Sequence, residues 1–319
     1  MKFTNKFRSS YLLLVFVLLP ACSFFKSDIK EIDSIKEVAL IFEHATNDDL
    51  FVFDVDQVIL ESTEPFMQAR FDNNSELKKI ADDFFEFIKS TKNPDAMDLF
   101  FSKMNLSVKT EPVEQLLIDQ ILALQKRSIK VITLTALNTG KFGLIDRLED
   151  WRYKQLLNLG LNFESSFEQK EIVIGELLDA ESINKKVRFK ERTRKDAGPI
   201  VFYKGIICST CYSKGPALKA FLDKAGYRPS QIYFFDDRPN NVKSVVQAMK
   251  TMGIKCQGFI YKAAAVKQPT DDLDIDVIKL QHELMRQRDD YVSYLDAKEV
   301  LEQKKLLNKN AVPAATVAQ

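Results

Sequence analysis

The sequence predicts an α/β fold with three layers, in which helices cover both faces of a mostly parallel sheet. Short apolar runs rich in Val, Ile and Phe alternate along the chain with longer segments whose apolar residues recur at helical spacing. This alternation favours parallel strands, because each helix carries the chain back to the edge where the next strand begins. The 319 residues, of which 45% are hydrophobic and 29% charged, are enough to bury a substantial core.

The first predicted core strand is LFVFDVD, residues 50–56, which sets two acids inside a run of Phe, Val and Leu. Residues 23–49 before it indicate a polar tether and a lead-in helix, since the apolar residues of SIKEVALIFEHA have amphipathic spacing. Residues 57–130 after it repeat Leu, Ile and Phe at helical spacing and predict a largely helical insert. The run KVITLT then indicates a β-branched strand over 131–135.

The second half of the predicted core alternates strands and helices up to residue 261. A long insert, 136–213, contains the strand-like segments EIVIGEL and PIVFYKGII. It is followed in order by the helix SKGPALKAFLDKAG, the strand IYFFDD, the helix NNVKSVVQAMKTMG and the strand KCQGFIY. Beyond the core, residues 270–308 predict a long charged helix or a helical pair, and residues 309–319 a disordered tail.

Composition narrows the chemistry that this chain can perform. The formal net charge is +1, so the overall charge of the chain gives no indication of a nucleic-acid partner. The only histidines are His44 and His282, which argues against a His-centred triad or a His-rich metal site. Catalysis must therefore depend on Asp, Lys, Thr or Cys.

The N-terminus has the features of an export signal. Basic residues precede the apolar run YLLLVFVLL, which is short for a membrane span. The following LPAC resembles a bacterial lipobox, in which Cys22 is lipidated and becomes the mature N-terminus. We therefore expect residues 1–22 to be a signal peptide and the protein to be a membrane-anchored lipoprotein facing the periplasm or the cell surface. Secretion without an anchor and an uncleaved anchor helix are the alternatives.

Three further cysteines lie in the predicted core. Cys208 and Cys211 form a CSTC motif, and Cys256 lies in the last strand. The motif allows a redox pair, half of a zinc site, a local disulfide or free thiols. No second CxxC or His pair completes a zinc site, so a structural pair or free thiols is the favoured interpretation.

Polar residues gather where the predicted strands end. Ligands of open α/β sheets bind beyond the carboxyl ends of the strands. Buried carboxylates are costly unless a cation meets them, so acids that close apolar strands need a function. Three predicted strands end in candidate residues, which are Asp54 and Asp56, Thr135, and Asp236 and Asp237. Two further candidates are Lys214, at the start of a predicted helix, and Asn241, which follows the acidic pair.

This order of motifs resembles the haloacid dehalogenase (HAD) superfamily of aspartate-nucleophile hydrolases. The motifs are an apolar strand ending in Asp-x-Asp, a strand ending in Thr, a Lys, and an acidic pair after an apolar strand, as in FFDDRPNNV. Within the superfamily the chain is most similar to an uncharacterised bacterial branch akin to the secreted acid phosphatases. The resemblance implies a Rossmann-like core over 50–56 and 131–261, with cap elements in the inserts 57–130 and 136–213.

The resemblance also implies a Mg²⁺-dependent phosphatase that hydrolyses a small phosphomonoester through an aspartyl-phosphate. Asp54 would be the nucleophile, and Asp56 would be the general acid and then the general base. Thr135 would hydrogen-bond the oxygens of the transferring phosphoryl group, and Lys214 would pair with their charge. Asp56 favours the phosphatase branch, because dehalogenases lack this second acid and cation-pumping relatives carry Thr there.

The implied Mg²⁺ ligands are the carboxylate of Asp54, one or both of Asp236 and Asp237, and the backbone carbonyl of Asp56. Asn241 would orient either that acid or the lysine. The sequence does not separate the roles of Asp236 and Asp237.

Two departures from the superfamily pattern keep other functions open. Gln57 stands where relatives have Gly, and Val58-Ile59 where they have Thr-Leu or Thr-Val, in the turn that aims Asp56. A catalytically quiet lipoprotein of this fold that binds a ligand or partner is one alternative. A phosphotransferase with the same aspartyl-phosphate is another. Neither the substrate nor the oligomeric state follows from the sequence.

Overall fold

The computed structural model describes residues 28–68, 75–177, 198–267 and 273–310. Within them the predicted α/β fold is confirmed, with an eight-stranded sheet in the order β1-β10-β9-β2-β5-β8-β7-β6. In this order, the strands from β1 to β8 are parallel to their neighbours. At the other end of the sheet, β7 pairs antiparallel with β8, and β6 pairs antiparallel with β7. The strands are β1 (Ile29–Ile32), β2 (Asp49–Phe53), β5 (Lys130–Thr135), β6 (Glu171–Gly175), β7 (Ile200–Tyr203), β8 (Ile206–Cys208), β9 (Gln231–Asp236) and β10 (Lys255–Tyr261).

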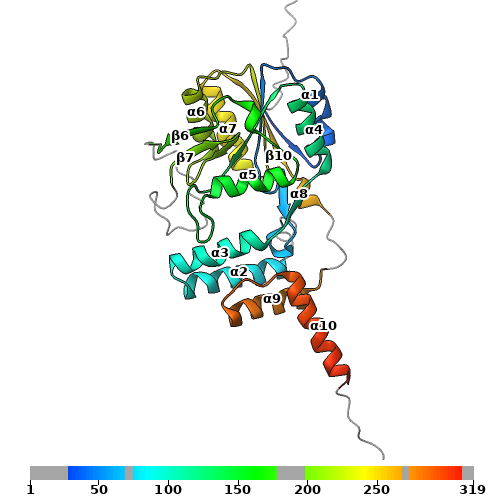
Figure 1. The fold of residues 1–319 in the computed structure, drawn as a ribbon. Coiled ribbons are helices and arrows are strands. Elements are labelled where there is room, and N and C mark those ends of the chain that lie inside the picture. Colours follow the sequence, from blue (N-terminus) through cyan, green and yellow to red (C-terminus); the bar gives the residue numbers. More distant parts are fainter. Residues whose placement is uncertain (1–27, 69–74, 178–197, 268–272, 311–319) are drawn as a thin grey trace, which may run out of the picture.

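Helices cover both faces of this sheet, as Figure 1 shows. One face carries α6 (Lys214–Ala225) and α7 (Pro239–Thr251). The other carries α1 (Ala39–Glu43), α4 (Gln115–Lys126), α5 (Leu148–Asn158) and α8 (Ala263–Val266). The molecule therefore has the three layers that the alternation of strands and helices predicts.

The central strand β2 shows how the sequence supplies both layers. Successive side chains of a strand point to opposite faces, so a strand covered on both sides is apolar throughout. Leu50 and Val52 pack against the α6–α7 layer, while Phe51 and Phe53 pack against the other layer. Phe53 also stacks on Phe235 of β9, with 4.8 Å between ring centroids. This packing fixes the strand ends that carry the acids.

The lead-in segment differs from its prediction at one end. Residues 29–32 form the edge strand β1, parallel to β10, where the sequence predicts a polar tether. The segment IKEI buries only Ile32 fully, because an edge strand faces solvent along one side. Such a short, half-polar strand lacks the apolar pattern that marks the central strands.

The first insert is shorter than predicted. Helix α4 lies within 57–130, yet it packs on the sheet and not with the other helices of the insert. Its buried face is formed by Leu117, Ile118, Ile121 and Leu124. Helical spacing predicts an amphipathic helix but does not say which apolar surface it covers.

The second insert, 136–213, contributes three strands to the main sheet. β6, β7 and β8 extend it, so this segment is not only a cap as the resemblance implies. The run PIVFYKGII is two strands, because Lys204 and Gly205 take positive φ angles of 48° and 86° in a two-residue hairpin turn. A side chain at Gly205 would meet the backbone of Phe163 at 2.4 Å, which leaves room for glycine alone.

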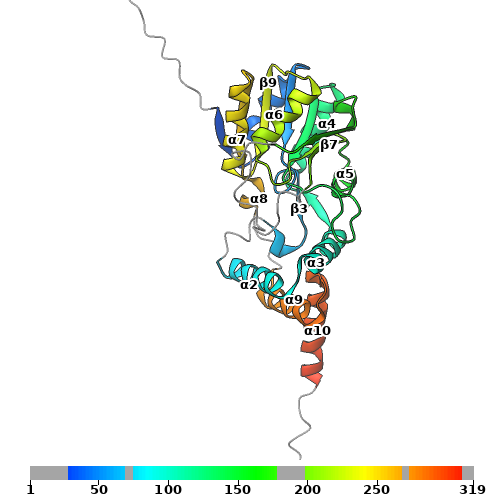
Figure 2. The same ribbon diagram turned by 90° about the vertical axis from the view of Figure 1, so that its left-hand side faces the viewer.

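Four helices form a second body below the sheet in Figures 1 and 2. They are α2 (Ser75–Thr91), α3 (Pro94–Ser107), α9 (Ile275–Arg288) and α10 (Tyr294–Asn310). The short antiparallel pair β3 (Leu60–Ser62) and β4 (Thr110–Pro112) leads from the core to α2 and α3 and back. The shared core of this body includes Leu77, Phe84, Phe100, Val277, Leu284 and Ala297.

The C-terminal segment is thus a helical pair, one of its two predicted forms. A buried Glu64 connects it to the insert, since it accepts hydrogen bonds from Gln281 Nε2 at 3.0 Å and from the backbone N–H of Tyr294 at 3.2 Å. Residues 309 and 310 continue α10, although the sequence predicts a tail there. The sequence does not foresee that these two distant segments share one core.

Several predictions fall outside the described residues. The signal peptide 1–22 with its lipidation site Cys22, the first part of the tether and the tail from 311 onward all do. In the part of the chain that is described, no helix is long and apolar enough to cross a membrane. Cys208, Cys211 and Cys256 are free thiols, which is one of the favoured interpretations of the CSTC motif.

Candidate active site

The predicted polar residues meet at one edge of the sheet because their strands are neighbours. β9, β2 and β5 lie side by side, and their carboxyl ends carry Asp236, Asp54 and Thr135. The backbone N–H of Asp54 donates to the carbonyl of Phe235 at 2.8 Å, which ties the two strand ends together. The strand predicted over 50–56 ends at Phe53, so Asp54 and Asp56 lie after β2. The turn that follows the strand therefore sets the directions of their side chains.

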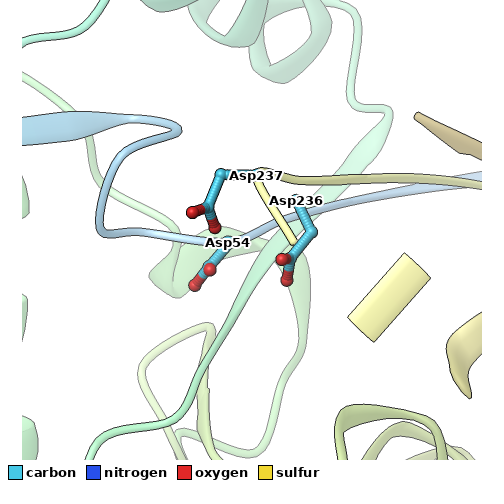
Figure 3. Close-up of side chains that lie close together, drawn as sticks. All are labelled: Asp54, Asp236 and Asp237. Atoms are coloured by element: carbon cyan, nitrogen blue, oxygen red, sulfur yellow. The ribbon is translucent and has the colours of Figure 1, made fainter. Parts of the chain in front are cut away.

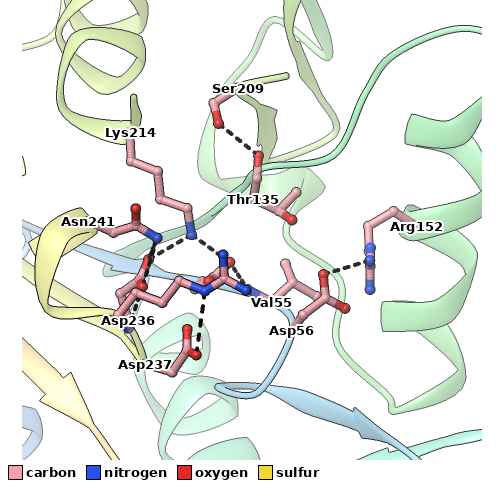
Figure 4. Close-up of polar contacts among 11 residues, drawn as sticks. Val55, Asp56, Thr135, Arg152, Ser209, Lys214, Asp236, Asp237 and Asn241 are labelled. Carbon is pink, nitrogen blue, oxygen red and sulfur yellow. Dashed lines mark hydrogen bonds and ion pairs between the residues drawn. The ribbon is translucent and has the colours of Figure 1, made fainter. Parts of the chain in front are cut away.

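Lys214 is the first residue of α6 and connects two of the acids. Its Nζ lies 2.6 Å from Asp54 Oδ1 and 2.7 Å from Asp236 Oδ2. Figure 4 shows Lys214 reaching toward Asp236. Burial alone lowers the pKa of Lys214, but the two carboxylates more than offset this, so its pKa lies above the usual range. The lysine is therefore a fixed positive charge between two strand ends.

Asp236 and Asp237 have different surroundings in the structure. Asp236 is fully buried, and its oxygens accept hydrogen bonds from the backbone N–H of Arg238 at 2.9 Å and from Asn241 Nδ2 at 3.0 and 3.1 Å. With Lys214 as a further donor, Asp236 is saturated and holds the lysine in place. The side chain of Asp237 is 25% exposed and its ion pair with Arg238 measures 3.8 Å, so its oxygens are the freer ones.

Three carboxyl groups at this edge form a candidate metal site. One oxygen each of Asp54, Asp236 and Asp237 lies within 4.8 Å of the others. Figure 3 shows the three side chains close together. Burial raises the pKa of Asp54 to about 7, with Asp236 adding to the shift and Lys214 opposing it. Burial, together with the charge of Asp54, raises the pKa of Asp237 to about 6. Three acids facing one ammonium have excess negative charge when ionised, which suits a divalent cation.

Asp56 lies apart from this cluster and faces an arginine that the sequence does not single out. Its Oδ2 accepts a hydrogen bond from Arg152 Nη2 at 2.9 Å. Arg152, on α5, is 5% exposed in its side chain, while that of Asp56 is 54% exposed. In Figure 4, Asp56 lies between Arg152 and the cluster around Lys214. The two residues are 96 positions apart, so no local pattern indicates their pairing.

Gln57 occupies the position in the turn where the superfamily has Gly. Its φ angle is +66°, in the left-handed region that glycine adopts without steric cost. The turn keeps its hydrogen bonds nevertheless, since Gln57 N–H donates to the carbonyl of Leu60 at 2.8 Å and its Nε2 to the carbonyl of Met67 at 3.1 Å. Gln57 thus adopts a backbone conformation that favours glycine, and these hydrogen bonds hold the turn that follows Asp56.

Thr135 ends β5 and is 2% exposed. Its carbonyl accepts hydrogen bonds from the backbone N–H of Ser209 at 2.8 Å and from the Ser209 hydroxyl at 3.2 Å. Among the described residues, its own hydroxyl makes no hydrogen bond to Lys214 or to the acids. Strand order brings Thr135 to the site, and the structure leaves its hydroxyl available to a ligand.

Gly215 lets α6 start close enough to α7 for Lys214 to reach the acids. A side chain there would meet the carbonyl oxygen of Ser244 at 2.2 Å. We expect Gly215→Ala to lower the free energy of unfolding by about 1–3 kcal/mol, because the helices must separate to admit a methyl group. Urea denaturation would measure this. Lys219→Ala, on the exposed side of α6, is the matched control and should change stability by less than about 0.5 kcal/mol.

Comparisons with known proteins cover most of the chain. The family model described as "Protein of unknown function (DUF2608)" matches residues 31–298. Among solved structures, a HAD family enzyme from Bacteroides thetaiotaomicron matches with 14% identity and a TM-score of 0.29, over 71% of this chain and 95% of that chain. The comparison with curated proteins gave no match. Because the family model covers more than half of the chain, including every residue of the candidate site, the chain belongs to the family described as Protein of unknown function (DUF2608).

Proposed function

We propose that this chain is a Mg²⁺-dependent phosphatase that hydrolyses a small phosphomonoester through an aspartyl-phosphate on Asp54. The observation that carries the proposal is Lys214 Nζ at 2.6 Å from Asp54 and 2.7 Å from Asp236, with a third acid, Asp237, beside them. A cationic group next to a nucleophilic carboxylate is what transfer of an anionic phosphoryl group requires.

The donor set suits the metal that the resemblance to the HAD superfamily implies. Mg²⁺ prefers a few carboxylate oxygens and keeps water and phosphate oxygens as its other ligands. Asp54 and Asp237 would supply the carboxylates, and the backbone carbonyl of Asp56 would add a further oxygen. Asp236 would stay in the second layer, because Lys214 and Asn241 already occupy its oxygens. When bound, the ion would neutralise part of the charge of the substrate phosphate.

The proposed chemistry needs two proton transfers and one covalent intermediate. A carboxylate oxygen of Asp54 attacks phosphorus, and the bond from phosphorus to the leaving oxygen breaks while Asp56 donates a proton to that oxygen. Asp56 then takes a proton from water, which attacks phosphorus and releases inorganic phosphate from Asp54. Lys214 and the Thr135 hydroxyl hold the oxygens of the transferring group.

The direct test is turnover of phenyl phosphate by the purified chain lacking residues 1–22. We expect phosphate release with Mg²⁺, loss of release after chelation, and recovery when Mg²⁺ returns. Unchanged release in the presence of the chelator would contradict the metal dependence. No release under any of these conditions would favour the alternative of a quiet binding protein.

Mg²⁺ should stabilise the folded chain more at about pH 8 than at about pH 5.5. The pKa of Asp54 is raised to about 7 and that of Asp237 to about 6. Without metal, the free energy of unfolding therefore falls as pH rises from the pKa values of these acids in the unfolded chain through those in the folded chain. A cation reverses this cost and competes with protons for the same oxygens. The melting temperature with and without Mg²⁺ at both pH values measures the effect. An equal shift at both, or an undiminished shift in Asp237→Asn, would contradict it.

Export of the protein and its attachment to a membrane form part of the same proposal. The basic and apolar N-terminal run and the lipobox-like LPAC support export and anchoring to a membrane through lipidated Cys22. Metabolic labelling with a radioactive fatty acid tests this, because Cys22→Ala should abolish incorporation. Label that persists in that variant would contradict the anchor site.

A further inference from the structure

Arg152 is buried, and the described residues do not use all of its hydrogen-bond donors. Its side chain is 5% exposed, and its Nε has no hydrogen-bond partner among the described residues. Buried polar groups in folded proteins are almost always paired, and a buried cation is especially costly to leave unsatisfied. Within the described part of the chain, Arg152 pairs with the carboxylate of Asp56, whose own side chain is more than half exposed.

The next turn of α5 also has a buried polar atom without a hydrogen-bond partner among the described residues. Gln155, three residues further along, has a buried Oε1 that also lacks a hydrogen-bond partner among the described residues. Residues three apart lie on one face of a helix, so Arg152 and Gln155 present an unsatisfied donor and acceptor together. The ring of Trp151 lies 5.0 Å from Arg152 Cζ and restrains the guanidinium from one side.

The position of Arg152 says which part of a substrate it can reach. The transferring phosphoryl group belongs over Asp54 and Lys214, and Asp56 faces the leaving oxygen in the proposed function. In Figure 4, Arg152 lies on the far side of Asp56 from Lys214. A group that contacts Arg152 is therefore attached to the leaving oxygen and not to the transferring phosphorus.

We infer that Arg152 is a specificity residue that binds a second anionic group, a carboxylate or another phosphate, on the leaving group of the substrate. This inference rests on the proposed function. A guanidinium binds carboxylate and phosphate oxygens through two parallel hydrogen bonds, and Arg152 has an unused donor for this. An anionic leaving group would also take over the Nη2 donor from Asp56, which frees Asp56 Oδ2 to face the leaving oxygen.

Two aryl phosphates that differ in one charge test the inference. Phenyl phosphate and 3-carboxyphenyl phosphate have the same ester bond, and a meta carboxylate changes the acidity of the leaving phenol little. We expect kcat/KM for the carboxylated ester to exceed that for phenyl phosphate by about tenfold, from one hydrogen-bonded charge pair. Arg152→Met should bring this ratio close to one, and Arg152→Lys should leave it between these values.

Arg147→Met is the matched control. Arg147 precedes α5 and pairs with Glu149 at 3.0 Å and Glu171 at 2.5 Å, away from Asp56. It should keep the ratio of the wild type. A ratio near one in the wild type, or an unchanged ratio in Arg152→Met, overturns the inference. A purely structural role would lower the melting temperature and both kcat/KM values equally, which also leaves the ratio unchanged and overturns it.

Failure of the proposed function gives a different result. Neither ester would then be hydrolysed, and the affinities of the two esters for the wild-type chain, measured by calorimetry with Mg²⁺, take the place of the kinetic ratio. Tighter binding of the carboxylated ester that is lost in Arg152→Met supports the inference without turnover. Equal affinities, or no binding of either ester, overturn it. If Arg152→Met does not fold, Arg152→Lys and Arg152→Gln provide the comparison.

Discussion

Asp54→Asn is expected to reduce turnover of phenyl phosphate by more than about 10³-fold, because an amide cannot form the aspartyl-phosphate. The same variant should fold at least as stably as the wild type when Mg²⁺ is absent. Burial raises the pKa of Asp54 to about 7, so the ionised carboxylate costs stability at about pH 8, and the neutral amide removes that cost. Lost activity with retained stability is the signature of a nucleophile rather than a packing residue.

Phosphate release and thermal melting measure the two parts of this prediction. Asp48→Asn is the control, since Asp48 is exposed just before β2, at the opposite edge of the sheet from Asp54. It should change neither quantity. Equal turnover by Asp54→Asn and the wild type would contradict the assignment of the nucleophile.

Lys214→Met should produce the largest loss of stability among the substitutions considered. The lysine side chain is 2% exposed and ion-paired to Asp54 and Asp236. Removing one partner of a buried ion pair costs about 3–5 kcal/mol, because the remaining charges stay buried without compensation. Turnover should fall together with stability, since Lys214 also pairs with the transferring phosphoryl group.

The pH dependence of this loss has a definite sign. Without the lysine, Asp54 and Asp236 lose the buried cation that opposes the rise of their pKa values. Ionisation of the two acids then costs more stability, so the deficit grows as pH rises. Urea denaturation at about pH 5 and about pH 8 measures it. The double variant Lys214→Met/Asp236→Asn should recover about 1–3 kcal/mol at the higher pH, because one buried charge is gone.

Lys219→Met is the control for these measurements. Lys219 lies on the same helix, exposed and paired with Asp223 at 2.7 Å, and its replacement should cost less than about 1 kcal/mol. A deficit in Lys214→Met that does not depend on pH, or no recovery in the double variant, would contradict the electrostatic account of the cluster.

The central strands and their acidic ends could be predicted because local pattern and sheet topology agree. Apolar β-branched and aromatic runs mark β2, β5 and β9, and the carboxyl ends of neighbouring parallel strands meet at one edge. Asp54, Thr135 and Asp236 follow from this rule with no knowledge of side-chain contacts, whereas Lys214 begins helix α6 and its place at the site was implied by the order of motifs in the HAD superfamily. The rule does not distinguish Asp236 from Asp237, because that depends on the donors Arg238 and Asn241.

The features that could not be predicted depend on contacts between residues far apart in the sequence. Helix α4 has the same apolar spacing as the insert helices, and only the sheet beneath it shows that it belongs to the core. Glu64 and Tyr294 are 230 positions apart, yet a hydrogen bond between them joins two segments into one helical body. Arg152 lies in LEDWRYKQLLN, where its charge indicates a solvated face, yet its side chain is buried and its hydrogen-bond partner Asp56 is 96 positions away.

The most direct test of the central claim is mass spectrometry of the wild-type chain quenched in acid during turnover of phenyl phosphate with Mg²⁺. The account predicts one added phosphoryl group on the peptide that contains Asp54, absent from Asp54→Asn. Turnover with the phosphoryl group on another residue, or with none on the chain at any time of quenching, would contradict it.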